Sequence, residues 1–304
     1  ASVPVDSPGR GITAERHHFL AAAAELSTLA GGTPALVAAV ARAWPGPPAP
    51  RVRLLPADLP YADLDLAADG GNPLALPVGV GEIDLRQVAV DFATDPHFLL
   101  FGDVESGKSS FLRALAATIT RRMAPEQARI ILVDYRRSLL GAVPESHLIG
   151  YGIDATTTAG LVEQLASALQ HRLPGPAITP QQLRDRSWWS GPECFVLVDD
   201  YDLVATGSSN PLASLLEYLP QARDIGWHLV LARRSGGAGR SLFDPVIQRM
   251  VELSSPGLVM SGNREEGRLI GGVRPGPLPP GRGWLVTRKQ GSRLVQLAHL
   301  PPPD

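Results

Sequence analysis

One stretch of the chain decides the fold, and it reads Phe98-Leu99-Leu100-Phe101-Gly102-Asp103-Val104-Glu105-Ser106-Gly107-Lys108-Ser109-Ser110. Its centre matches the pattern G-x-x-x-x-G-K-[ST] in full. An apolar run of strand length precedes the loop, and a helix-length segment follows it to Met123. Strand, glycine-rich loop and helix in this order predict a phosphate-binding loop, because successive backbone amides and a helix N-terminus attract an anion.

Each residue type in the loop has a physical role in holding a nucleoside triphosphate. Gly107 lets the backbone approach the phosphates, Lys108 neutralises charge on the β- and γ-phosphates, and the Ser109 hydroxyl binds Mg²⁺. We expect ATP and Mg²⁺ as cofactors, with the nucleotide held by Gly102, Asp103, Val104, Glu105, Ser106, Gly107, Lys108, Ser109 and Ser110. Asp103 and Glu105 would repel phosphate by about 1 kcal/mol or more if they pointed inward. The sequence leaves their direction open.

A loop of this kind works with an acidic residue at the end of an apolar strand, which holds Mg²⁺ through water. Two apolar runs end in such an acid, one at Asp199 and one at Asp134. We assign the metal to Asp199, because the strand beside the loop in RecA-like ATPases usually comes later in the chain. Asp134 remains the alternative, and on our assignment it is a structural or partner-facing acid.

Two further positions bear on hydrolysis. Many motor ATPases place a glutamate directly after the metal aspartate, where it polarises the attacking water. Here that residue is Asp200, which is one methylene shorter, so we expect either a poor general base with slow hydrolysis or a helix N-cap. Arg233 stands where such ATPases carry a sensor of the γ-phosphate. It is a candidate charge clamp, and the alternative is an ion pair with surface acids.

After about residue 75, apolar runs of strand length alternate with helix-length segments. The strand candidates are 88–92, 97–102, 130–134, 194–199, 227–232, 257–260, 283–287 and 294–297, and the main helix candidates are 109–123, 157–172 and 211–222. Continuously apolar strands indicate a parallel sheet that is buried on both faces. We expect an α/β fold: a RecA-like P-loop NTPase of the additional-strand type, with helices on both faces and an antiparallel edge near the C-terminus.

The first fifty residues have a different pattern. Helical patterns over 14–29 and 34–44 lead into a proline-rich connector at 45–50, and 51–56 is typical of a short strand. We expect a helical N-terminal segment with a linker over residues 1–50, a candidate remnant of a preceding domain. Residues 51–304 then form the ATPase domain. No internal repeat is apparent.

Composition narrows the classes of function. The 304 residues carry a formal net charge of −2, so nothing in the overall balance attracts nucleic acid. The one cysteine excludes a disulfide within the chain and fits a reducing compartment. No apolar run approaches the ~20 residues that span a bilayer, so we expect no direct membrane insertion of this chain.

Four stretches together resemble the FtsK/SpoIIIE branch of additional-strand ATPases, and more closely the last ATPase domain of the EccC-type ATPases of type VII secretion. They are Arg51-Val-Arg-Leu-Leu-Pro56, Phe101-Gly-Asp-Val-Glu-Ser-Gly-Lys-Ser-Ser110, Ala232-Arg-Arg-Ser-Gly-Gly237 and Pro279-Pro-Gly-Arg-Gly283. Two features depart from the motor relatives. The metal pair is Asp-Asp where motors have Asp-Glu, and Arg233 replaces a glutamine that senses the γ-phosphate.

The resemblance implies a terminal domain that binds ATP and Mg²⁺, hydrolyses ATP weakly or not at all, and recognises the C-terminal tail of WXG-type exported proteins or regulates its neighbours. Its implied partners are the preceding ATPase domains of the same or a partner chain, in a hexamer in the full assembly. The implied place is the cytoplasmic part of a membrane-associated secretion complex. Two alternatives stay open: an active FtsK-like DNA translocase, and an ATPase that is active only when oligomerised. No peptide-binding residue is assigned.

Overall fold

The computed structural model describes residues 3, 9–21, 32–47, 52–67, 71–206 and 209–303, the side chains of residues 240 and 241 excepted. The chain forms two compact units, Ala1–Val52 and Arg53–Asp304. In the first unit, strands β1 (Arg10–Ile12) and β2 (His18–Leu20) pair antiparallel, and helix α1 spans Gly32–Ala43.

Two predictions for the amino-terminal part are wrong where the structure describes it, and one is confirmed. Helix α1 matches the helix predicted at 34–44. Residues 14–21 form a turn and strand β2 instead of a helix, because Arg16 adopts a φ of 66°; the rest of that segment lies outside the described residues. Residues 52–56 form no strand, since the Arg282 guanidinium binds the carbonyls of Leu55 and Pro56 at 3.3 and 2.6 Å.

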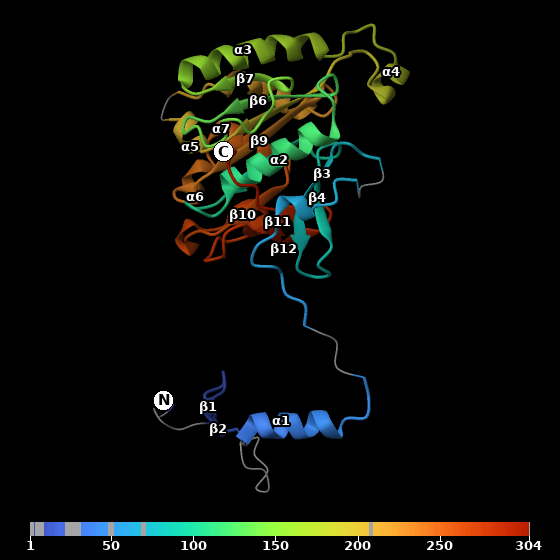
Figure 1. The fold of residues 1–304 in the computed structure, drawn as a ribbon. Coiled ribbons are helices and arrows are strands. Elements are labelled where there is room, and N and C mark those ends of the chain that lie inside the picture. Colours follow the sequence, from blue (N-terminus) through green and yellow to red (C-terminus); the bar gives the residue numbers. More distant parts are fainter. Residues whose placement is uncertain are drawn as a thin grey trace. The chain divides into compact units, whose positions relative to one another are not determined.

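The second unit is built on one sheet, in which the described strands follow the order β4-β3-β12-β11-β10-β5-β9-β8-β6-β7 (Figure 1). The six strands from β10 to β7 are parallel, and the other four run antiparallel to their neighbours. The strands are β3 (Ala75–Gly81), β4 (Gln87–Asp91), β5 (His97–Phe101), β6 (Ala128–Val133), β7 (Leu148–Gly152), β8 (Glu193–Val198), β9 (Trp227–Arg233), β10 (Gly257–Met260), β11 (Arg282–Thr287) and β12 (Gly291–Leu297).

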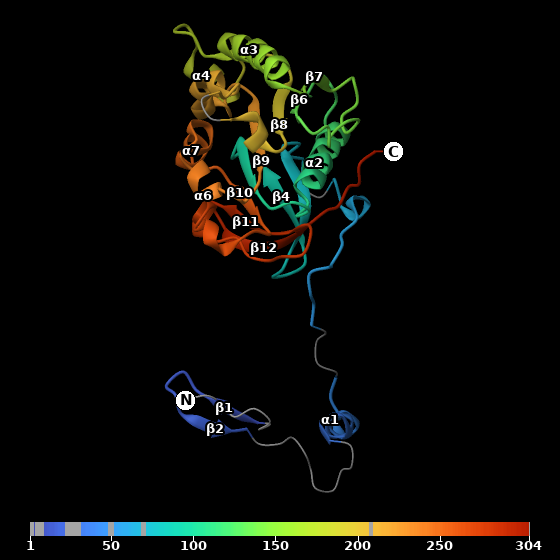
Figure 2. The same ribbon diagram turned by 90° about the vertical axis from the view of Figure 1, so that its left-hand side faces the viewer.

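Helices cover both faces of the sheet; Figure 2 shows α2 on one side and α6 and α7 on the other. The α-helices are α2 (Lys108–Arg122), α3 (Ala155–Arg172), α4 (Pro180–Asp185), α5 (Tyr201–Val204), α6 (Ala238–Ser241) and α7 (Pro245–Glu252). Short 3₁₀ helices are η1 (Tyr61–Asp63), η2 (Ala213–Gln221), η3 (Arg264–Glu266) and η4 (Ile270–Gly272). None of the helices in the described part of the chain is long and apolar enough to cross a bilayer.

Strand β5 shows why this sheet needs helices on both sides. All five of its residues are buried, and their side chains alternate between two cores. Phe98 and Leu100 pack in the core that includes α2, whereas Leu99 and Phe101 pack in the core that includes α3 and α7. The continuous apolar run thus places the loop that follows β5 at the carboxyl edge of the sheet.

The predicted α/β class is confirmed, with a larger antiparallel part than expected. Strands β3 and β4, which precede the loop in sequence, join β11 and β12 at the same end of the sheet. Strand β3 escaped prediction because Pro77 and two glycines interrupt its pattern, and β7 because it reads Leu-Ile-Gly-Tyr-Gly. The helix predicted at 211–222 is a 3₁₀ helix that contains Pro220.

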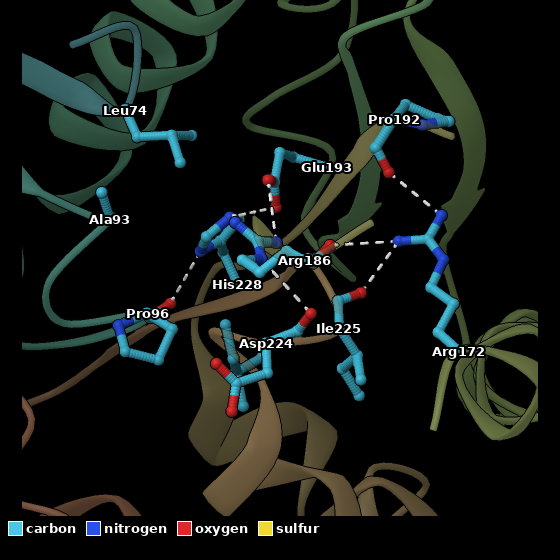
Figure 3. Close-up of polar contacts among 12 residues, drawn as sticks. Leu74, Ala93, Pro96, Arg172, Arg186, Pro192, Glu193, Asp224, Ile225 and His228 are labelled. Atoms are coloured by element: carbon cyan, nitrogen blue, oxygen red, sulfur yellow. Dashed lines mark hydrogen bonds and ion pairs between the residues drawn. The ribbon is translucent and has the colours of Figure 1, made fainter. Parts of the chain in front are cut away.

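A polar network joins the elements at the amino ends of the central strands (Figure 3). The Arg172 guanidinium, at the end of α3, donates to the carbonyls of Ile225, Gly226 and Pro192 at 3.0–3.3 Å. Nearby, the His228 ring contacts the Glu193 carboxylate at 3.1 Å. These contacts hold the loop before β8 against the turn before β9, at the edge opposite the phosphate loop.

Candidate nucleotide-binding site

The loop at 102–109 is held by its neighbours on two sides. The Gly102 amide donates to the carbonyl of Arg233 at the end of β9, at 3.1 Å. The amide of Gly281, just before β11, donates to the carbonyl of Ser106 at 2.8 Å. Strand ends that follow the loop by more than a hundred residues therefore fix its shape.

Two glycines are required by this geometry. Gly107 has a φ of 107°, and a Cβ there would lie 3.2 Å from the Gly281 amide nitrogen. A Cβ on Gly102 would collide with the Ser106 hydroxyl. Both positions therefore need the absence of a side chain, as the loop pattern predicts.

The charged side chains of the loop take up different positions. Lys108 is buried, and its Nζ donates to the carbonyl of Asp103 at 3.0 Å. Glu105 is exposed and has a φ of 61°, whereas Asp103 is half-buried. Solvent therefore screens the Glu105 charge. Val104 is exposed, and the Ser110 hydroxyl donates to the Leu300 carbonyl at 3.1 Å, so the C-terminal segment contacts that end of the loop.

The Ser109 hydroxyl donates to Asp199 Oδ2 at 2.5 Å, which brings the two predicted metal ligands together. The Ser138 hydroxyl donates to the same oxygen at 3.0 Å. Asp199 is 1% exposed, and burial raises the pKa of its carboxyl group, while the two serine hydrogen bonds act against that rise. Converging hard oxygens suit Mg²⁺, which usually takes few protein ligands and keeps water and phosphate oxygens.

Asp134, the alternative metal ligand, has a structural role. Its carboxylate is fully buried and accepts hydrogen bonds at 2.7–3.2 Å from the amides of Arg136 and Leu139 and the hydroxyls of Ser138 and Tyr151. These partners leave its oxygens little capacity for a metal. The geometry therefore favours Asp199.

Asp200 and Arg233 are each held by protein partners. Asp200 Oδ2 lies 2.9 Å from Arg136 Nε, and its backbone is left-handed at φ 44°. It precedes helix α5, but its side chain makes no capping hydrogen bond. Arg233 Nε donates to the Arg234 carbonyl at 3.2 Å. Burial lowers the pKa of Arg233, and nearby acids, chiefly Asp202, counteract it.

Sequence reasoning missed two residues that support the site. Ser138 lies between the two strand-end acids: its Oγ is 3.0 Å from Asp199 Oδ2 and 3.2 Å from Asp134 Oδ1, so its one hydrogen can be donated to either. Arg113, on α2, donates to the carbonyls of Ser138 and Leu300 at 3.0 Å each. Neither residue belongs to a sequence motif. Only the folding of the chain brings them close to the two predicted metal ligands.

A cavity of about 260 Å³ opens beside the loop. It is lined in part by Gly107, Ser110, Pro280, Gly281, Gln296 and His299. No group of three or more His, Cys, Asp or Glu side chains that could hold a metal is present among the described residues.

Comparisons with known proteins agree with this geometry. The model of the FtsK/SpoIIIE family matches residues 69–177. The chain is 51% identical, over 98% of its length, to the ESX secretion system protein EccC of Thermomonospora curvata, and covers 23% of it. It is 44% identical, over 99% of its length, to the ESX-4 secretion system protein EccC4 of Mycobacterium tuberculosis, and covers 24% of it. The chain thus spans about a quarter of the length of these relatives.

Two solved structures from Thermomonospora curvata, both 51% identical, match 98% of the chain with a TM-score of 0.83. One is the cytoplasmic domain of the type VII secretion ATPase EccC, of which the chain covers 35%. The other is EccC (ATPases 2 and 3) in complex with a signal sequence peptide, of which the chain covers 54%. Sequence, fold and loop geometry agree: the chain carries an FtsK/SpoIIIE-family P-loop domain and is similar to EccC-type ATPases over nearly its whole length.

Proposed function

We propose that this domain binds ATP with Mg²⁺ at residues 102–110, turns it over slowly by itself, and recognises the C-terminal tail of a WXG-type exported protein within a type VII secretion ATPase. The observation that carries the nucleotide part is the Ser109–Asp199 contact at the mouth of the loop. On this proposal the domain works as the last ATPase domain of the cytoplasmic part of a membrane-associated, hexameric motor.

The chain's own residues divide the work of binding. Loop amides and Lys108 would hold the phosphates, and Ser109 with Asp199 would hold the metal, which supplies positive charge to the β- and γ-phosphate oxygens when bound. The cavity between Gly107 and His299 would take the base and ribose, since Gly107 and Ser110, at the junction of the phosphate loop and α2, line it. Such subsites are largely preformed.

Slow turnover follows from how the two candidate catalytic groups are held. The carboxylate of Asp200 is in an ion pair with Arg136, so it is drawn away from the role of a general base. Arg233 lies among acids and donates to a backbone carbonyl. A base that is one methylene short and already paired is poorly oriented to polarise water, and orientation supplies much of the rate.

Nucleotide binding is tested by titrating a fluorescent ATP analogue into the 304-residue chain with and without Mg²⁺. We expect saturable binding that needs Mg²⁺ and is lost in Lys108→Ala, with little turnover. Lys289→Ala is the matched control, because this lysine lies outside the loop and should bind normally. Equal binding by wild type and Lys108→Ala contradicts the proposal, and turnover that rises steeply with protein concentration favours an ATPase that needs its oligomer.

Tail recognition is a separate part of the proposal. It is supported by the relative whose ATPases 2 and 3 were solved with a signal sequence peptide and which matches 98% of this chain. The measurement is calorimetry of the domain with C-terminal tail peptides of WXG-type proteins from the organism that encodes this chain. A scrambled peptide of the same composition is the control. An absence of heat from every cognate tail would overturn this part and leave nucleotide binding standing.

A further inference from the structure

Two stretches of the sequence that lie apart from the phosphate loop and its metal ligands meet in the structure. One is residues 52–56, where the chain enters the domain, and the other is residues 279–283, which read Pro-Pro-Gly-Arg-Gly and lead into β11. The Arg282 guanidinium of the second stretch donates to the carbonyls of Leu55 and Pro56 in the first, at 3.3 and 2.6 Å. The two stretches therefore form one contact, although 226 positions separate Arg282 from Pro56.

The same arginine supports the wall of the cavity beside the phosphate loop. Arg282 Nε donates to Gln296 Oε1 at 3.1 Å, and Gln296, which is 2% exposed, lines the cavity. The Gln296 amide nitrogen donates to the Pro280 carbonyl at 3.2 Å. The residue before the arginine, Gly281, donates its backbone amide to the carbonyl of Ser106 in the phosphate loop. Arg282 thus connects the entering chain with both parts of the proposed nucleotide site.

The entering chain is attached firmly from Leu59 onward. The Leu59 carbonyl accepts from the His299 amide at 2.7 Å, and the Tyr61 amide donates to the His299 carbonyl at 3.0 Å. Tyr61 Oη also lies 3.1 Å from the Thr118 hydroxyl of α2. A small apolar cluster buries this segment against α2 and the residues after β12; its members are Leu59, Tyr61, Leu64, Ala114 and Ala298. Residues 59–64 therefore fix the point from which the preceding residues extend.

Residues 55–58 are held less firmly, and they lie at the mouth of the cavity. Ala57 and Asp58 line the cavity, and both are exposed. Within the part of the chain that the structure describes, the hydrogen bonds to residues 55–58 come from the Arg282 guanidinium alone. In that part, their one ion pair joins Asp58 to the exposed His299 at 3.9 Å, and exposed pairs contribute little. One side chain therefore decides whether this segment lies over the cavity.

We infer that Arg282 is a positioning residue of the nucleotide site, which holds residues 55–58 as a strap across the cavity that takes the base and ribose. This role rests on the proposed function, because it needs a nucleotide in the cavity. A base and ribose there would contact Ala57 and Asp58 on one side and Gln296 on the other, so they bind best when the strap is docked. Because coupling between two equilibria is reciprocal, a bound nucleotide holds the strap in place to the same extent. Occupancy of the site thereby sets the path by which the chain enters the domain.

The phosphate part of the site is separate from the strap. Lys108 and Ser109, which would bind the phosphates and the metal, are not among the residues that line the cavity. Within the described residues, no hydrogen bond or ion pair joins the strap to the phosphate loop. A ligand that has phosphates but no base should therefore bind equally well whether the strap is docked or released.

Such a ligand separates a positioning role of Arg282 from a merely structural one. We compare the binding of ATP and of inorganic tripolyphosphate, each with Mg²⁺, to the 304-residue chain and to Arg282→Gln. We expect the substitution to weaken ATP binding about tenfold, as coupling between sites commonly does, and tripolyphosphate binding less than about twofold. Arg288→Gln is the matched control, because Arg288 follows β11 in the same hairpin and also donates to a backbone carbonyl, that of Leu253. This variant should bind both ligands as the wild type does.

Each outcome of this comparison decides a different point. Equal weakening of the two ligands contradicts the positioning role, because the substitution would then damage the phosphate loop through the Gly281–Ser106 hydrogen bond. Unchanged ATP binding by Arg282→Gln, with a wild-type circular dichroism spectrum, contradicts it as well. If the wild type binds neither ligand, the proposed function itself fails, and the role of Arg282 falls with it.

Thiol labelling follows the strap in a chain that keeps Arg282. Leu55 is half-buried and does not line the cavity, so the labelling rate of Leu55→Cys reports docking of the strap and not contact with the ligand. The chain's own Cys194 is 3% exposed and should react far more slowly. We expect saturating ATP with Mg²⁺ to slow the labelling of Leu55→Cys at least about fivefold, and tripolyphosphate to slow it less than about twofold.

Val52→Cys is the matched control for labelling. Val52 is 86% exposed and precedes the strap, so its variant should react at the same rate without ligand, with ATP and with tripolyphosphate. If bound ATP leaves the rate of Leu55→Cys unchanged, the strap does not respond to nucleotide and the proposal is wrong. Slowing by tripolyphosphate as large as that by ATP also overturns it, because the phosphates alone would then act on the strap.

Discussion

Asp199 and Asp134 end neighbouring strands in the same way, but their surroundings give them different roles. Asp134 accepts hydrogen bonds that fold the segment after β6, so we expect Asp134→Ala to lower the free energy of unfolding by about 3 kcal/mol. Asp199 is buried beside Asp200 and Asp134, which makes its charge costly. Asp199→Ala should therefore leave stability unchanged or raise it, while Mg²⁺-dependent nucleotide binding weakens about tenfold, or about 1.4 kcal/mol.

Urea unfolding and nucleotide titration on both variants check this prediction. The two substitutions serve as controls for each other, because each should move one measurement and spare the other. If Asp134→Ala kept its stability and lost Mg²⁺-dependent binding, the metal assignment would have to move to Asp134.

His97 gives the domain a pH dependence of known sign. The ring is 1% exposed, and burial lowers its pKa to about 3 from 6.5. The unfolded chain therefore binds the proton first, so the stability that neutral His97 contributes is present above pH 6.5 and is lost as the pH falls toward 3. At pH 5 the loss should be about 2 kcal/mol.

The measurement is urea unfolding at pH 7.5 and at pH 5, for the wild type, His97→Gln and His17→Gln. We expect the difference in unfolding free energy between the two pH values to shrink by about 2 kcal/mol in His97→Gln. The exposed His17 should give the wild-type difference. An undiminished difference in His97→Gln would show that other groups cause the acid sensitivity.

At the scale of single residues, the sequence predicts the features that consecutive residues define. The phosphate loop could be recognised because its glycines and lysine serve a backbone shape that eight consecutive residues define. The choice of Asp199 over Asp134 rested on strand order, and the structure adds the physical reason, which is the set of donors around Asp134. Ser138 and Arg113 could not be predicted, because their roles depend on contacts across 61 and 187 positions of the sequence.

The segment after β12 is the element whose role is least visible in sequence. The Leu300 carbonyl accepts from the Ser110 hydroxyl and from Arg113 Nε, and the Leu300 amide donates back to Ser110. The Ala298 amide donates to Val78 of β3. This segment therefore holds the first turns of α2, and the phosphate loop ends where α2 begins.

We expect a chain that ends at Leu297 to bind nucleotide about tenfold more weakly, since the lost hydrogen bonds free the first turn of α2. A chain that ends at Pro302 is the control, because it keeps Leu300 and its carbonyl. Nucleotide titration and circular dichroism on both chains check the expectation. Full affinity in a folded chain ending at Leu297 would show that α2 needs no support from this segment.

Helices and strands with a clear pattern of apolar residues were predicted. Elements that combine strand-forming and turn-forming residues were not. Helix α2 and the apolar strands β5, β8 and β9 follow from their sequence pattern alone. Strands β3 and β7 carry proline or glycine, and their pairing partners stabilise them instead. The β1–β2 hairpin was missed for a related reason: its strands are three residues each, too short for a period to show.

At the scale of the whole molecule, the sheet has a parallel part and an antiparallel part, and different segments of the chain form them. The parallel half follows the βα alternation that the sequence displays, and its order places Asp199 and Arg233 at one edge with the loop. The antiparallel half brings strands from before the loop beside strands from the end of the chain. Such pairing has no local signal, because strands from opposite ends of the domain form it.

Charge is the whole-molecule property that separates a protein-secreting role from a DNA-translocating one. The chain has a formal net charge of −2, and a protein that neutralises several phosphates needs a basic surface whose binding falls steeply with salt. We therefore expect linear duplex DNA at about 50 mM salt to change ATP turnover by less than about twofold and to bind with a Kd weaker than about 100 µM. Turnover assays and fluorescence anisotropy over a salt series measure both. DNA-stimulated hydrolysis that weakens with salt and is abolished by Lys108→Ala would favour the translocase, because charge localised on one face would then outweigh the balance of the whole.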